Sequence, residues 1–445
     1  MYGLTIHFCI DSILYYIKVF ISYLDKSSKG GKFMLKWKKI LIVLSCMMLQ
    51  AVPYSMAQNV GPLFIKPLEN AYTFDLQQIG YIFTIGAVVA AMVSPFVGKF
   101  FKKNTVKYVM QVGLIVSGLG IFMNSFAKNI GMLLLGSAIT QIGAITFSGL
   151  GVPYLIANWF SKKEKAKALG IVFAGGTIGN FFLQPIVELL LNIYSVHMVY
   201  AICGITSIVV GSVIILIFIN TNNSSENIQN IKINDKEPVL VEKGIGYKAT
   251  MRLKSFWRLG FFYFLIGLSI SALSTQYADY FFSIGVSKHI IGLIGSVFAA
   301  SCLIGNLWGG ILFAKLGVEK AMGTSFILQV LALMSIFSGL LNHNIAIIAG
   351  VGWAVFYGLN VFSYMSGPAI MMQNLFGMKG TSQILGTFSI FLAVGFALGN
   401  IVFGMFVYKF GFGIGWLSIT CYTTIGFIGL LTVMKGIVEQ NYAVE

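Results

Sequence analysis

The sequence has few charged residues. Charged side chains make up 10% of its 445 residues, whereas apolar ones make up 57%. A soluble domain carries about 25% charged residues, so this chain lacks the polar surface that a water-soluble globule of its size needs. The apolar residues fall instead into long runs, each near the roughly 20 residues that span a bilayer. Helices are the expected form of these runs, because every backbone group inside a membrane must find its hydrogen-bond partner within the protein.

Twelve such runs follow one another, so the sequence predicts an all-α membrane protein with twelve transmembrane helices. One long polar stretch, rich in Asn, Ser, Lys and Glu, divides them into two sets of six. We therefore expect a six-helix bundle over 34–219, a cytoplasmic linker over 220–256, and a second six-helix bundle with a short tail over 257–445. The runs begin near Ile40, Gly80, Tyr108, Met132, Ala168, His197, Gly260, Ile290, Ala321, Asn344, Ile384 and Phe412.

Residues 1–33 form an N-terminal extension that does not fit this pattern. The stretch up to Leu24 is fairly apolar, but it contains Asp11 and Lys18 and lacks a small-residue cleavage site, so it does not resemble a signal peptide. Met34, followed by a short basic segment and the first run, resembles a translation start. We expect either translated upstream sequence or an interfacial helix on the inner leaflet. A thirteenth span is the less favoured interpretation.

Positive charge is concentrated in alternate segments between the runs. The net charge of +16 could indicate a nucleic-acid partner, but the lysines lie where the positive-inside rule places them. Lysine clusters at 36–39, 99–107, 162–167 and 232–254 would all face the cytoplasm, and Lys66, Lys128, Lys288 and Lys409 would lie outside. The sequence thus predicts a multi-pass protein of the cytoplasmic membrane with both termini inside, in contact with lipid and not with nucleic acid.

Residues that ligate metals or act as nucleophiles are scarce and scattered. The five cysteines and four histidines show no metal-ligand spacing, and no catalytic triad or phosphate-binding loop is present. The glycines Gly175, Gly176 and Gly179 lie inside an apolar run without a preceding strand, which favours helix packing over nucleotide binding. We expect no metal, no cofactor and no enzymatic activity. Only two of the 30 basic residues are Arg, a bias typical of AT-rich genomes.

The two halves of the sequence resemble each other. At a constant offset of 216 in the numbering, Asn158 matches Asn374 and Lys163 matches Lys379, in loops that occupy equivalent places in the two halves. Gly170 likewise matches Gly386, and Gly179 matches Gly395. A second similarity relates the basic loop that follows Gly98 to the one that follows Gly310. Duplicated halves are typical of carriers that move two bundles around a central site. Chance similarity between glycine-rich helices is the alternative.

Over residues 34–440 the chain resembles the major facilitator superfamily. The family's loop signature, Gly-x-Leu-x-Asp-Arg-x-Gly, is similar to Gly310-Ile-Leu-Phe-Ala-Lys-Leu-Gly317, with Ala314 in place of the Asp. The first half keeps the glycine and the positive charge but has Lys102 at the Asp position. The resemblance implies two six-helix bundles of this fold and a gating role for these loops. The gating residues it assigns are Gly98, Lys102, Lys103, Gly310, Lys315 and Gly317.

One branch of the superfamily shows a closer resemblance. Asn158-Trp-Phe-Ser-Lys-Lys163, followed by Ala168-Leu-Gly-Ile171 and Ala174-Gly-Gly176, is similar to the signature around helices 4 and 5 of the monocarboxylate porters and oxalate–formate antiporters. Leu375-Phe-Gly377 with Gly386, and Gly404 with Gly411, resemble later features of that branch. The resemblance implies organic anions as substrates.

Polar residues inside membrane spans are costly, which makes them candidates for function. They recur at helical spacing in the first, fourth, seventh and tenth spans, which in the resembling family line the central cavity. Interhelical hydrogen bonding without ligand contact is the alternative for each of them. The candidates are Gln50, Tyr54, Gln58, Gln141, Ser148, Ser271, Thr275, Tyr357, Asn360 and Tyr364.

Two acids qualify as proton-coupling residues, Glu188 and Asp279. A carboxyl group in a medium of low dielectric constant resists ionisation and can exchange a proton near working pH. Counting about 1.5 Å per residue puts both near the outer surface, so solvated residues at the cavity mouth are the alternative.

The later spans contain no basic residue between 290 and 314 or between 384 and 407. A dianion would therefore have no buried counter-charge, at a heavy desolvation cost. Either the substrate is bulkier and more apolar, or its charge is met by hydroxyls, amides and helix N-termini. Tyr54, Tyr357 and Tyr364 would suit an amphipathic monoanion.

Taken together, these patterns predict a secondary active transporter that works as a monomer by alternating access. The expected substrate is a small organic anion, either a monocarboxylate or an amphipathic acid, moved with a proton. Efflux of hydrophobic compounds, a non-transporting membrane sensor and a membrane enzyme are the alternatives.

Overall fold

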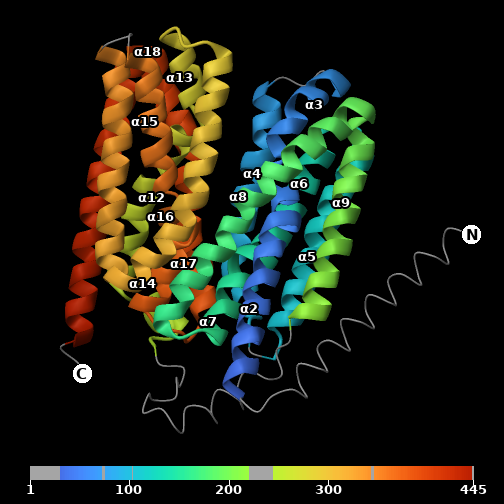
Figure 1. The fold of residues 1–445 in the computed structure, drawn as a ribbon, viewed down its shortest axis with the longest axis vertical. Coiled ribbons are helices and arrows are strands. Elements are labelled where there is room, and N and C mark those ends of the chain that lie inside the picture. Colours follow the sequence, from blue (N-terminus) through green and yellow to red (C-terminus); the bar gives the residue numbers. More distant parts are fainter. Residues whose placement is uncertain (1–30, 73–75, 103, 220–243, 342–344, 443–445) are drawn as a thin grey trace, which may run out of the picture.

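A computed structural model describes residues 31–72, 76–102, 104–219, 244–341 and 345–442. Most of the predicted N-terminal extension, most of the linker, and Lys103 lie outside the described residues. Within them the protein is helical, and its helices form two bundles that stand side by side (Figure 1).

The N-terminal bundle contains the helices up to residue 218. Its first, fourth and sixth spans change from α-helix to π-helix along their length. The elements are α2 (Gly31–Leu49), η1 (Gln50–Asn59), η2 (Gly61–Phe64), α3 (Ile65–Tyr72), α4 (Leu76–Gly98), α5 (Val106–Met123), η3 (Asn124–Phe126), α6 (Ile130–Ala144), η4 (Ile145–Gly151), α7 (Val152–Trp159), α8 (Lys162–Ile193), α9 (Val196–Val213) and η5 (Ile214–Phe218).

The C-terminal bundle begins after the linker with a short helix and contains two very long helical elements. The elements are α11 (Tyr247–Thr250), α12 (Lys254–Thr275), α13 (Tyr277–Ser283), α14 (Lys288–Leu341), α15 (Ala346–Leu359), α16 (Phe362–Met365), α17 (Gly367–Leu375) and α18 (Thr381–Tyr442).

Among the described residues, nine helices are long and apolar enough to cross a membrane. Two of these, α14 and α18, each consist of two helices joined at a glycine, Gly317 with φ 79° and Gly411 with φ 79°. Only glycine adopts this backbone conformation without strain. Each of the two therefore provides two spans, and the shorter apolar segment Thr84–Gly98 of α4 provides one more. This arrangement agrees with the twelve helices predicted from the sequence.

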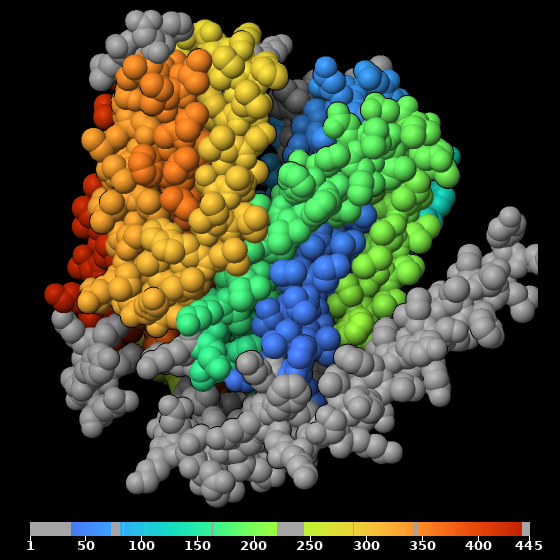
Figure 2. Space-filling view, viewed as in Figure 1, coloured from blue at the N-terminus to red at the C-terminus, as the bar shows by residue number. Residues whose placement is uncertain are grey.

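The two bundles touch at their lower ends, near α7 and α17, and separate at their upper ends (Figure 1). The space-filling view shows a cleft between them at the top, and below it α8 lies against α14 (Figure 2). Buried apolar side chains follow the same pattern, because the largest cluster contains residues of both bundles and the other two lie within one bundle each. The molecule is thus closed at one end and open at the other.

Glycines allow the bundles to approach closely at the lower end. A Cβ atom on Gly170 of α8 would lie 2.5 Å from the carbonyl oxygen of Asn306, and one on Gly386 of α18 would lie 2.8 Å from the carbonyl oxygen of Ser94. The Ser94 hydroxyl donates a hydrogen bond to the carbonyl of Gly386 at 2.7 Å. These two crossings are related by the internal repeat, since Gly170 and Gly386 are equivalent positions.

Inside each bundle, equivalent helix contacts also occur at positions where the sequences of the two halves show little similarity. Gly179 of α8 packs against Ala51 and Ser55, and a hypothetical Cβ on this glycine would overlap atoms of both. In the C-terminal bundle, Gly395 meets Gly267, which is the position equivalent to Ala51 at the offset of 216. The first and seventh spans are thus equivalent, although their sequences show little similarity.

We predict that Gly386→Ala will disfavour this closed lower end, because the added methyl group would overlap the backbone of Ser94. Overpacking of this kind costs about 1–3 kcal/mol. Spin labels at Lys99 and Lys379, both exposed, should report a population with longer distances between the bundles. Gly404→Ala on the same helix is the control, since nothing lies within 4 Å of its Cβ position. Unchanged distances in Gly386→Ala would contradict the prediction.

Candidate substrate-binding cavity

The first and fourth spans both widen into π-helices at the same depth of the N-terminal bundle. Element η1 contains Pro53, which has no N–H group and cannot continue a regular helical ladder. Element η4 follows α6 directly, and the side chains of Gln50 in η1 and Ser148 in η4 are hydrogen-bonded at 3.0 Å. π-Helical turns are rare and occur frequently at functional sites.

Two predicted residues of the N-terminal bundle, Gln58 and Gln141, are hydrogen-bonded to each other. The amide of Gln141 donates to the side-chain oxygen of Gln58 and, at 3.4 Å, to the carbonyl of Ala57. Tyr54 lies one turn before Gln58 on the same element, η1. Gln58 is exposed, Tyr54 is half-buried and Gln141 is buried. The sequence thus predicted a set of residues that the fold brings together.

The C-terminal bundle has a polar group at the equivalent place. The Tyr357 hydroxyl donates to the carbonyl of Ile270 at 2.9 Å, and the Tyr357 ring stacks on that of Tyr364 with ring centroids 6.4 Å apart. At the offset of 216, Tyr357 is the equivalent of Gln141, and Ser274 is the equivalent of Gln58. The pair Gln58–Gln141 in one bundle therefore corresponds to the pair Ser274–Tyr357 in the other.

A second pair of equivalent contacts lies nearby. Thr275 donates to the side-chain oxygen of Asn400 at 2.6 Å, and in the first half the Gln184 amide donates to the carbonyl of Asn59 at 3.2 Å. Ser274, Asn400, Asn59 and Gln184 were missed in the sequence. The offset of 216, applied to Gln58, would have found Ser274.

Two predicted residues face the interior of the C-terminal bundle. Asn360 is fully buried, accepts a hydrogen bond from Ser325, and donates to Gln329 at 2.7 Å. Ser271 is fully buried as well and packs against Gly399. Both side chains contribute to contacts between helices in this conformation.

The two predicted acids, Glu188 and Asp279, are exposed near the upper end. Glu188 lies in the last two turns of α8, and Asp279 lies in the first turn of α13. Their role in proton coupling stays a prediction.

The gating loops lie at the lower end of the molecule. Gly98 packs on Gln383, and Gly310 packs on Ala166 and Gly170. Lys102, Lys315 and Gly317 are exposed.

The first gating loop has Lys102 at the Asp position, and the hydroxyl of Thr105 makes the side-chain hydrogen bonds within the loop. Thr105 donates to the carbonyl of Phe100 at 2.6 Å and accepts from the N–H of Lys102 at 3.2 Å. This threonine closes the loop on itself.

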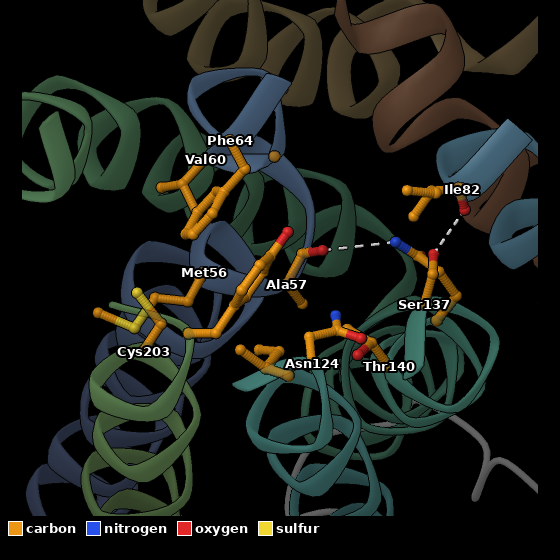
Figure 3. A pocket seen from close by; sticks show the side chains of 13 residues that line it. Met56, Ala57, Val60, Phe64, Ile82, Asn124, Ser137, Thr140 and Cys203 are labelled. Atoms are coloured by element: carbon orange, nitrogen blue, oxygen red, sulfur yellow. Dashed lines mark hydrogen bonds between the residues drawn. The ribbon is translucent and has the colours of Figure 1, made fainter. Parts of the chain in front are cut away.

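A small cavity of about 50 Å³ lies behind η1, inside the N-terminal bundle (Figure 3). Its polar wall is formed by Asn124, Ser137, Thr140 and Gln141, and apolar side chains such as Met56 and Phe64 face them. Ser137 donates to the carbonyl of Ile82 at 2.7 Å. In the described part of the chain no group of three or more His, Cys, Asp or Glu could hold a metal ion.

Two equivalent helical bundles with matched polar pairs define a multi-pass membrane transporter. The model of the Major Facilitator Superfamily matches residues 43–283, more than half of the chain. The chain belongs to the major facilitator superfamily, as its sequence motifs predicted.

Similar proteins support this assignment. Monocarboxylate transporter 12 of Homo sapiens is 24% identical over 35% of this chain and 30% of its own length. A probable vesicular acetylcholine transporter-B of Danio rerio is 24% identical over 33% of this chain and 31% of its own length. The chain thus spans about a third of the length of these curated relatives. The structure of the transporter FucP in its outward conformation has a TM-score of 0.63 at 15% identity, covering 89% of this chain and 98% of FucP.

We predict that Asn360→Val will lower stability without changing substrate affinity, because it leaves the buried Ser325 and Gln329 side chains without their partner. An unpaired buried polar group costs about 1–3 kcal/mol. Thermal unfolding in detergent measures the loss. The exposed Gln58 provides the comparison, since Gln58→Ala should alter stability far less. Equal destabilisation of the two variants would contradict the prediction that the buried Asn360 stabilises the fold more than the exposed Gln58 does.

Proposed function

We propose that this protein is a secondary active transporter that carries a small organic anion across the cytoplasmic membrane by alternating access. The observation that supports it best is the asymmetry between the two ends, where bundles related by the repeat touch below and part above (Figure 2). Exposed lysines such as Lys99, Lys102 and Lys315 lie at the closed end. By the positive-inside rule this end is cytoplasmic, and the cleft opens outward. Residues 34–219 and 257–445 are then the two moving units.

The polar pairs are the proposed substrate contacts. Gln58 with Gln141 approaches the substrate from one bundle, and Ser274 with Tyr357 and Tyr364 approaches it from the other. All are neutral groups that donate hydrogen bonds through an amide or hydroxyl. Such donors suit a carboxylate whose single charge is spread over two oxygens. The name of monocarboxylate transporter 12 supports the same class of substrate.

A proton is the proposed coupling ion, with Glu188 and Asp279 as its binding groups. Both are exposed near the open end, where they would exchange protons with the outside. Symport is the expected mode, because one bound proton and one bound monoanion together add no net charge to the carrier as it crosses between its two states.

Export of hydrophobic or cationic compounds is the second candidate. The match to a probable vesicular acetylcholine transporter favours it, since that name specifies an organic cation. The neutral cavity pairs do not by themselves exclude this class of substrate.

A thermal-stability screen of the purified protein separates the two candidates. A ligand that binds only the folded state stabilises it by RT ln(1 + [L]/Kd), about 2.7 kcal/mol at one hundred times Kd. We expect small or amphipathic carboxylates to raise the unfolding temperature, with a larger shift at lower pH. A shift produced only by cationic or neutral hydrophobic compounds would overturn the anion proposal in favour of export.

Substitutions at the polar pairs should weaken transport more than stability. Gln141→Ala and Tyr357→Phe each remove a donor, so we expect KM for the carboxylate identified in the screen to rise roughly tenfold or more.

Asp279→Asn and Glu188→Gln should leave carboxylate binding intact but abolish its pH dependence. Transport in proteoliposomes, with and without a pH gradient, measures both effects. Gradient-driven uptake that survives in both acid variants would disprove the role of these two residues.

A further inference from the structure

The only two arginines of the chain lie close together in the sequence. They are Arg252 and Arg258, and the other 28 of the 30 basic residues are lysine. The composition therefore favours lysine wherever a positive charge alone is needed. Arginine offers what lysine does not, a planar guanidinium group that can donate two parallel hydrogen bonds to one phosphate or carboxylate. Both arginines lie in one short segment, so a group that needs this paired geometry could be bound there.

Arg258 belongs to an exposed stripe at the lower end of α12. Lys254, Trp257, Arg258 and Phe261 occupy positions i, i+3, i+4 and i+7, which share one face of a helix, and all four are exposed. The basic residues lie nearest the helix end, and the aromatic residues extend towards the bilayer, 50% exposed at Trp257 and 53% at Phe261. From Lys254 to Phe261 the stripe covers about 10 Å of helix.

The turn before α12 holds the other arginine next to this stripe. The indole N–H of Trp257 donates to the carbonyl of Met251 at 2.9 Å, which fixes the ring against the turn that carries Arg252. Trp257 also packs edge-on against Phe256 and Phe391, with ring centroids 5.8 Å away in both cases. Lys248 in α11 is exposed one turn earlier. Rigid aromatic packing thus positions the basic cluster.

Neither guanidinium group has an internal role among the described residues. The salt bridge found there joins Lys39 to Glu164, and the rings that lie under a cation belong to phenylalanines contacted by lysines. No hydrogen bond from the side chain of Arg252 or Arg258 occurs in the described part of the chain. Internal pairing therefore gives no reason for arginine in preference to lysine at these positions.

We propose that this cluster binds the phosphate of an anionic phospholipid headgroup in the leaflet that faces the closed end. Arg258 and Arg252 bind the phosphate oxygens, Lys254 and Lys248 add charge, and the acyl chains lie along Trp257 and Phe261. The aromatic half of the stripe favours a lipid over free phosphate, because a soluble anion needs no apolar surface. Aromatic side chains beside basic ones at the membrane interface fit the boundary between headgroups and acyl chains.

Native mass spectrometry of the full-length protein tests the site. The protein is mixed with phosphatidylglycerol, with phosphatidylcholine, or with inorganic phosphate, and the retained molecules are counted. We expect preferential retention of phosphatidylglycerol. Arg252→Gln/Arg258→Gln should retain it about 25-fold less, since each basic contact near an anionic surface changes binding by roughly fivefold. The charge-preserving variant Arg252→Lys/Arg258→Lys keeps both charges and loses only the paired guanidinium hydrogen bonds, so it should retain the lipid about fivefold less.

Lys320→Gln is the matched control, because it removes an exposed positive charge at the same end of the molecule, and it should change retention less than twofold. Thermal unfolding of the arginine variants without lipid confirms that they are folded. Equal retention of the two lipids would overturn the proposal. So would wild-type retention in the Arg→Lys variant, or displacement of phosphatidylglycerol by inorganic phosphate at equal concentration. None of these measurements involves transport, so they test the lipid site independently of the proposed substrate.

Discussion

The close backbone contact between the two bundles is the constraint on which the rest of the structure depends. Within a bilayer, apolar side chains gain little by leaving lipid for protein, so helices associate through close packing and hydrogen bonds. Gly170 and Gly310 bring α8 and α14 together, with each hypothetical Cβ overlapping the opposite backbone, and Gly386 does the same for α18 and α4. Closure at one end leaves the other end open, and the cleft follows from these contacts.

The two crossings are equivalent in position but not in their hydrogen bonds. Ser94 donates to the carbonyl of Gly386, whereas the equivalent Asn306 is buried and its side-chain oxygen has no partner among the described residues. An unpaired buried acceptor costs about 1–3 kcal/mol. The crossing of α4 with α18 thus includes a hydrogen bond from Ser94 that the side-chain oxygen of Asn306 does not match at the crossing of α8 with α14.

The sequence predicted the spans and the repeat well, because both depend on local properties. Hydrophobic length determines where a helix crosses the membrane, and loop motifs preserve the offset of 216. Side-chain direction was harder to predict. Spacing of four residues places Ser271 and Thr275 on one face, but it does not tell which neighbour that face meets. Ser271 packs against Gly399, while Thr275 is exposed and bonds Asn400.

The π-helices explain a further part of this difficulty. Gln50, Tyr54 and Gln58 were aligned with a period of 3.6 residues, but η1 begins at Gln50 and follows a wider turn. In the structure Gln50 is buried against Ser148, and Gln58 is exposed. The sequence signalled the irregularity only through Pro53. The hydrogen-bonded pairing of Gln58 with Gln141 could not be derived from the spacing alone.

The shortage of charge that marks the whole sequence also limits what the cavity can recognise. The groups proposed to line it are amides and hydroxyls, and the two candidate acids, Glu188 and Asp279, are exposed near the open end. Neutral donors can compensate one delocalised negative charge, since hydrogen bonds to charged groups contribute about 1.5–3 kcal/mol each. A second charge would need a cation, because burying an unpaired ion costs far more than such bonds return. The same reasoning places the strongest cationic groups of the protein, Arg252 and Arg258, at the membrane surface, where headgroups and water can solvate them.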